Sequence, residues 1–164
     1  MATASVPPAL LSDWPLFRAP CNFPPVSPLY THEVIRAMRD RLQTIQTISK
    51  IALGLMAFLA GLDKFFNLLT NWEQYVSPLS QRMLPLSPTS LMHVVGVIEM
   101  VVGLMILTKA TRLGAYVAAA WLVCIALELV TTGHFFDIAV RDLELAVAAF
   151  VLAKLTEITE SSAA

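Results

Sequence analysis

Four apolar stretches, each long enough to cross a membrane as a helix, dominate this sequence after its first 44 residues. They cover about residues 45–69, 90–107, 113–131 and 136–154. A transmembrane helix needs about 20 mostly apolar residues, because the hydrocarbon core of a bilayer is about 30 Å thick. Only 14% of the chain is charged, whereas soluble domains carry roughly 25%. The sequence therefore predicts an integral membrane protein.

The connections between the later stretches are very short. KATR at 109–112 separates the second stretch from the third, and GHF at 133–135 separates the third from the fourth. Turns of this length allow consecutive helices to pack only as antiparallel neighbours. The predicted fold class is thus all-α: an integral membrane four-helix antiparallel bundle.

Two further segments precede the first stretch. Residues 1–30 hold seven of the ten prolines and predict an extended arm, which is either disordered or ordered against a partner. Residues 31–50 place apolar side chains such as Val34 and Met38 at helical spacing, between arginines. This pattern indicates an amphipathic helix at the membrane surface that leads into the first span. Residues 31–158 are thus the membrane domain, and residues 159–164 form a tail.

Lysine and arginine predict the orientation, because they collect in cytoplasmic segments. The chain up to Lys50 holds five of them, and the connection between the second and third spans holds Lys109 and Arg112. Both termini are therefore expected in the cytoplasm, in a multi-pass protein of the inner (plasma) membrane. The loop at 70–89, with Trp72 and Tyr75, is expected on the outer surface, as a cap on the bundle or as a partner surface.

Glycines mark the helix faces that should pack most closely. Gly54 and Gly61 are seven residues apart in the first span, and so are Gly96 and Gly103 in the second. Seven residues complete nearly two helical turns, so each pair lies on one face. Helices in lipid associate through such small residues. We therefore expect these faces to form helix–helix contacts.

Ionisable residues lie inside or at the ends of the apolar stretches. An unpaired charge at the bilayer centre costs about 2.5–3.5 kcal/mol on insertion scales, so we expect them to face inward and pair near the outer side. Such a cluster is a candidate functional site; alternatively, it is a buried ion network that only fixes the register of the bundle. The predicted cluster comprises Lys64, Glu99, Glu128, Asp137, Arg141 and Glu144.

Other chemistry finds little support in the sequence. A net charge of −1 gives no basis for nucleic-acid binding, and no dinucleotide, phosphate-loop or HExxH motif is present. The two cysteines form no CxxC pair. A metal site from His93, Glu99, Glu128 and His134 is a minor alternative that matches no defined motif, so no metal is predicted. The chain is expected not to be an enzyme on its own.

Three segments resemble the DoxX family of four-helix bacterial membrane proteins. They are LGLMAFLAGLDKF at 53–65, GVIEMVVGLMIL at 96–107 and RDLELAVAAFVLAKL at 141–155, within a resemblance that covers about residues 48–156. The positions that match the family pattern are Lys64, Gly96, Glu99, Gly103, Arg141 and Asp142.

The resemblance implies association with a membrane redox complex, because some relatives are subunits of quinone-reducing sulfur oxidoreductases. Quinone is then the candidate cofactor, and the polar cluster would bind its head group or relay protons. The partners are the lipid bilayer and other membrane subunits. The alternative function is a non-catalytic accessory or structural subunit that docks partners through its arm and its first loop.

Overall fold

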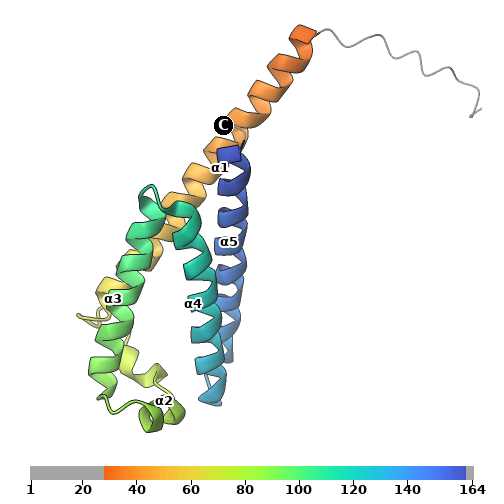
Figure 1. Ribbon diagram of the computed structural model, residues 1–164. Coiled ribbons are helices and arrows are strands. Elements are labelled where there is room, and N and C mark those ends of the chain that lie inside the picture. The colour runs from red at the N-terminus through yellow and green to blue at the C-terminus, as the bar shows by residue number, and fades with distance from the viewer. Residues whose placement is uncertain (1–27, 162–164) are drawn as a thin grey trace, which may run out of the picture. The chain divides into compact units, whose positions relative to one another are not determined.

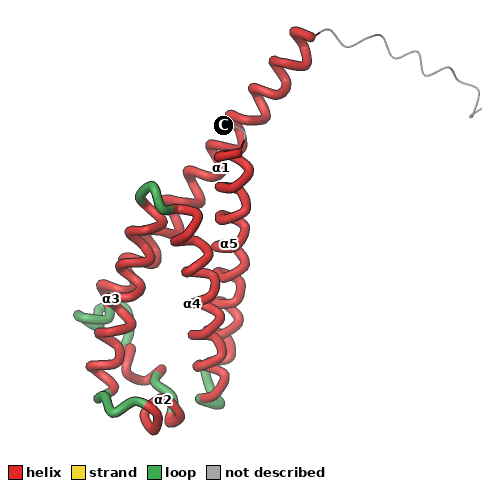
Figure 2. Tube along the Cα trace, in the orientation of Figure 1, coloured by secondary structure: helices red, strands yellow, loops and turns green. Residues whose placement is uncertain are grey.

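The computed structural model describes residues 28–161, and that range contains helices and turns but no strand (Figure 2). Its elements are α1 (Pro28–Asp63), η3 (Trp72–Tyr75), α2 (Pro78–Met83), α3 (Pro88–Leu107), α4 (Thr111–Thr131) and α5 (Phe136–Ser161) (Figure 1). Residues 38–161 belong to one compact unit, and the described part of the other unit, residues 28–37, is the helical start of α1. The arm predicted for residues 1–30 lies outside the described residues, except that helix begins at Pro28 rather than at residue 31.

The predicted amphipathic segment and the first span are parts of one helix, α1, which is 36 residues long. The prediction that this span continues to residue 69 is wrong, because α1 ends at Asp63. The Asp63 carboxylate accepts hydrogen bonds from the backbone N–H groups of Leu68 and Leu69, at 3.0 and 3.2 Å. Asn67 adopts a left-handed conformation with φ of 51°. These contacts form a turn directly after the helix. Lys64 is therefore the first residue beyond α1.

The other three long helices agree with the predicted spans to within a few residues, apart from the longer C-terminal end of α5. Ser87 caps the N-terminus of α3, where its side chain accepts a hydrogen bond from the Ser90 N–H. The turn before α4 is held by the Thr111 hydroxyl, which donates to the Ile106 carbonyl oxygen. Gly133, with a φ of 73°, follows the end of α4. α3 therefore begins, and α4 ends, at a residue suited to that position.

Three helices of the described chain, α1, α3 and α4, are long and apolar enough to cross a membrane. α5 is not among them, because charged residues are spread along it. Its 26 residues nevertheless span about 39 Å, and it packs closely along α4 in the antiparallel direction (Figure 1). We therefore place α5 at the same membrane depth as α4, as the fourth helix of the bundle.

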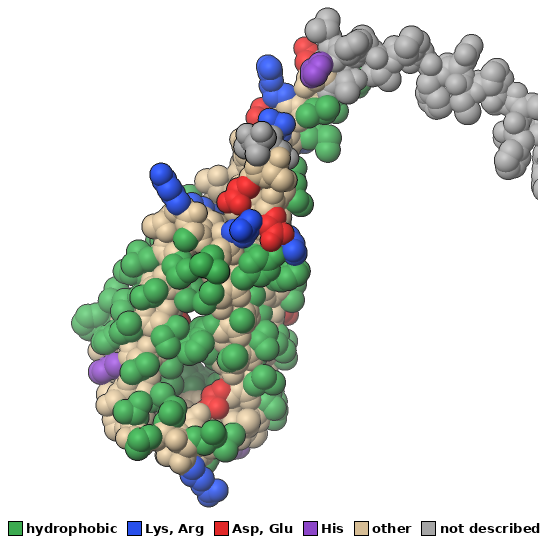
Figure 3. Space-filling view, viewed as in Figure 1, with side chains coloured by type: hydrophobic (Ala, Val, Ile, Leu, Met, Phe, Trp, Pro, Cys, Tyr) green, Lys and Arg blue, Asp and Glu red, His purple; other side chains and the backbone are tan. Residues whose placement is uncertain are grey.

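Small residues occupy much of the interior, and many large apolar residues are exposed on the outside. Ala115, Ala118, Ala149 and Ala153 are buried where α4 meets α5. Hydrophobic side chains cover much of the surface over the helices (Figure 3). Helices that associate in lipid show this arrangement, whereas a soluble protein rarely exposes such large apolar areas. The surface therefore fits a membrane-embedded bundle.

The four glycines of the predicted packing faces meet where α1 crosses α3. A Cβ atom added to Gly61 would lie 2.5 Å from the Gly96 carbonyl oxygen, and one added to Gly96 would lie 2.6 Å from the Gly61 oxygen. About two turns further along α3, a Cβ on Gly103 would lie 2.8 Å from the Gly54 oxygen. The two backbones are thus in direct contact, and no larger residue fits there without separating the helices.

We predict that Gly61→Ala destabilises the bundle by about 1–3 kcal/mol, the usual effect of overpacking. The added methyl group would collide with the α3 backbone rather than with a movable side chain. Thermal unfolding in mild detergent should show a lower Tm. Ala120→Val, on an exposed position of α4, is the control and should leave the Tm unchanged. Equal Tm values for Gly61→Ala and the natural chain would contradict the prediction.

Candidate functional site

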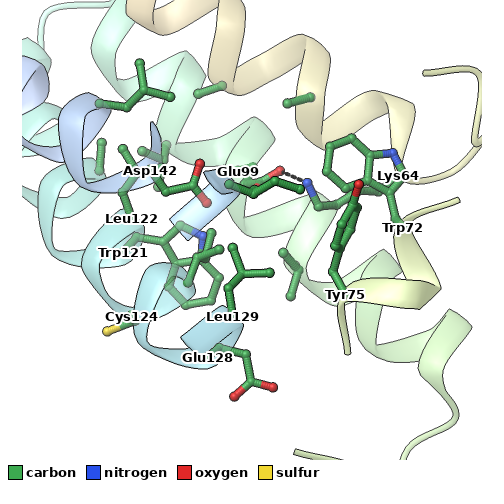
Figure 4. A pocket seen from close by; sticks show the side chains of 18 of the residues that line it. Lys64, Trp72, Tyr75, Glu99, Trp121, Leu122, Cys124, Glu128, Leu129 and Asp142 are labelled. Atoms are coloured by element: carbon green, nitrogen blue, oxygen red, sulfur yellow. Dashed lines mark hydrogen bonds and ion pairs between the residues drawn. The ribbon is translucent and has the colours of Figure 1, made fainter. Parts of the chain in front are cut away.

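A cavity of about 730 Å³ lies between the four long helices. This volume is in the usual range for small-molecule sites. Its wall is mostly apolar, with a few polar side chains that point into it (Figure 4). The apolar part of the wall includes Leu53 and Met56 of α1, Val95 and Val102 of α3, Leu122 and Ile125 of α4, and Leu145 and Ala149 of α5.

The strongest polar contact in the wall is the ion pair between Lys64 and Glu99. The Lys64 Nζ lies 2.5 Å from the Glu99 Oε2, and the two side chains are only 5% and 12% exposed. The same ammonium group lies 3.8 Å from the centre of the Trp72 ring. Glu99 is on α3 between Gly96 and Gly103, so the close approach of α1 brings the end of α1 to this carboxylate.

Two further polar groups face the cavity from α4 and α5. Asp142 is buried on the same face of α5 as Ala139, Ala146 and Ala149. The Arg141 Nε lies 3.9 Å from its Oδ1, although the Arg141 side chain is 62% exposed. The indole Nε1 of Trp121 is buried and has no hydrogen-bond partner among the described residues. A buried donor without a partner is unfavourable, so this N–H is available to a bound molecule.

The loop between α1 and α3 covers one end of the cavity. Glu128 of α4 accepts hydrogen bonds from the Ser77 backbone N–H, at 3.2 Å, and from the Ser80 hydroxyl. On the other side of the loop, the Thr89 hydroxyl donates to Glu73, at 2.6 Å. Residues of this loop, including Trp72, Tyr75 and Ser80, line the cavity. Glu128 therefore joins the cover of the cavity to α4.

Asp137 and Glu144 do not lie where the sequence analysis placed them. Both are exposed on α5, and neither forms an ion pair within residues 28–161. The buried carboxylate of α5 is Asp142 instead. Because two residues span 200° of a helix, a helix that buries Asp142 must turn Glu144 outward. The alanine stripe on the Asp142 side was the signal that could have identified the inner face.

The histidines considered as metal ligands are separated from the carboxylates. The ring of His93 stacks on Phe65 with 4.7 Å between the ring centres, and His134 is exposed. Across the described chain, no three His, Cys, Asp or Glu side chains are close enough to hold a metal ion. The alternative metal site of His93, Glu99, Glu128 and His134 is therefore not formed.

Together these features define an α-helical membrane protein with a ligand-sized cavity whose wall carries a buried ion pair. The DoxX family model matches residues 45–134, more than half of the sequence. The chain belongs to the DoxX family. No curated protein and no solved structure matches it. The matched range contains Lys64, Glu99 and the glycine faces, and it ends before α5, so the resemblance at 141–155 stays a prediction.

We predict that Lys64→Met and Glu99→Gln each destabilise the protein by about 3–5 kcal/mol, because either change leaves the partner's charge buried and unpaired. The double variant Lys64→Met with Glu99→Gln should recover much of this loss, since it buries no charge. Thermal unfolding in detergent measures all three. Lys109→Met, at an exposed lysine, is the control. Losses in the double variant equal to the sum of the single losses would refute the pairing.

Proposed function

We propose that this DoxX-family membrane protein binds a quinone in its cavity, as a subunit associated with a membrane redox complex. The observation that supports this proposal is the Lys64–Glu99 ion pair at the wall of an otherwise apolar cavity. A quinone combines a long apolar part with a small head whose carbonyl oxygens accept hydrogen bonds. The apolar wall suits the first part, and the polar groups suit the second.

The residues of the wall divide naturally into donors and proton-exchanging groups. The Trp121 Nε1–H and the Lys64 ammonium group would donate hydrogen bonds to the head-group oxygens. Glu99 and Asp142 are carboxyl groups in the same wall and would exchange protons with those oxygens. A quinone supplies redox chemistry when bound. Electrons would come from a redox subunit of the complex, and for that reason the chain would not act as an enzyme alone.

The same proposal places the protein in the inner membrane with both termini in the cytoplasm. Lys50, Lys109 and Arg112 belong to one end of the bundle, where the Lys50 Nζ donates to the Thr108 carbonyl oxygen at 2.7 Å. Clusters of lysine and arginine favour the cytoplasmic side. The loop that covers the cavity, at the opposite end, would then face outward.

An accessory role without a ligand is the second candidate. It is favoured by the exposed apolar side chains of the loop, since Leu68, Leu69 and Met83 are all more than 70% exposed. Such side chains could contact a partner subunit. Under this alternative the ion pair would only fix the helix register, and the purified protein would contain no quinone.

We predict that the protein purified in mild detergent contains quinone, detected by solvent extraction and chromatography. Trp121→Phe keeps the aromatic volume but removes the N–H, so quinone affinity should fall about fivefold to tenfold, the effect of one hydrogen bond. Titration with a short-chain quinone, followed by the rise in Tm, measures this. Phe150→Leu, at an exposed position of α5, is the control. No extracted quinone and no saturable Tm shift would exclude the proposal.

A further inference from the structure

The outward face of α5 carries charge at a depth where the neighbouring helices carry none. Glu144 is exposed on this face, beside Val140 and Val147. Arg141 lies at the edge of the face: its side chain is 62% exposed, although it also borders the cavity and lies 3.9 Å from Asp142. From the start of α5 at Phe136, Arg141 lies about 8 Å and Glu144 about 12 Å along the helix axis. The exposed residues within the α3 and α4 spans are apolar instead, as at Val97, Val101 and Leu127.

These charges are unfavourable if lipid covers the face. A charged side chain in the hydrocarbon core is strongly disfavoured. Asp137 needs no cover, because it lies in the first turn of α5 at the membrane surface, where the helix dipole favours a negative charge. Arg141 can extend its long side chain toward the surface. Glu144 is deeper and shorter, so a protein surface with a positive charge is the better neighbour.

We propose that a second copy of this chain covers this face, with Arg141 of each copy paired to Glu144 of the other. Within the span, this side of α5 holds one positive residue, Arg141, and one negative residue, Glu144, three positions apart. It is therefore complementary to itself across a two-fold axis along the membrane normal, which gives two reciprocal ion pairs. The face also carries Ala148, a small residue between Val147 and Val151, which permits close approach of two helices.

Charge reversal with exchange between two chains tests this pairing. Arg141→Glu alone would place two pairs of carboxylates in contact, and Glu144→Arg alone would place two pairs of guanidinium groups in contact. Each variant alone should therefore form dimers about tenfold or more weakly than the natural chain. A mixture of the two variants restores both ion pairs, so the differently tagged chains should co-purify as a mixed dimer. Single-molecule photobleaching in lipid vesicles measures each dimer fraction.

A steric pair of variants separates assembly from folding. Val147→Trp, on the proposed interface, should reduce the dimer fraction, whereas Leu127→Trp, on the apolar outward face of α4, should not; the two positions are 64% and 62% exposed. A monomeric natural chain would overturn the proposal. So would charge-reversed variants that dimerise normally, a mixture that fails to restore the dimer, or a different membrane protein bound to α5 in place of the second copy. None of these results depends on whether quinone binds.

Discussion

Direct backbone contact between α1 and α3 is the constraint on which the candidate site depends. At the crossing, the carbonyl oxygen of each of Gly61 and Gly96 faces the position that a side chain would occupy on the other. This proximity places Lys64, which follows α1, against Glu99 of α3. In lipid there is little hydrophobic force to bring helices together, so close packing and buried polar contacts must do so. The glycines and the ion pair thus support each other: the first bring the helices close, and the second gives their contact a fixed register.

The cavity follows from how the other helices are joined. The turn between α3 and α4 is short and held by Thr111, and from that turn the two helices diverge toward the end that carries α2 (Figure 1). α4 and α5 remain in contact through alanines along their length. The space between α3 and the α4–α5 pair therefore holds the cavity, whose wall includes Trp121, Glu128 and Ser80 of the covering loop.

Much of the fold could be predicted from the sequence, and part of the site could not. Hydropathy located the four long helices, and the seven-residue glycine spacing identified the α1–α3 faces and placed Glu99 beside them. The end of α1 was missed because Phe65, Phe66, Leu68 and Leu69 continue the apolar stretch, while the carboxylate of Asp63 binds the N–H groups of Leu68 and Leu69. On α5, Asp137 and Glu144 were expected to face inward beside Arg141, but the buried carboxylate is Asp142, on the alanine side of the helix. The contact of Ser80 with Glu128 joins distant segments and has no local signal.

The hydrogen bonds between Glu128 and the covering loop link the order of the loop to the contents of the cavity. Ser80 and Glu128 both line the cavity and also hold α2 to α4. A molecule that enters beside them competes for, or reinforces, the contacts that keep the loop in place. Protease cleavage between Met83 and Leu86, where the side chains are exposed, would then vary with occupancy and report binding without any label on the ligand.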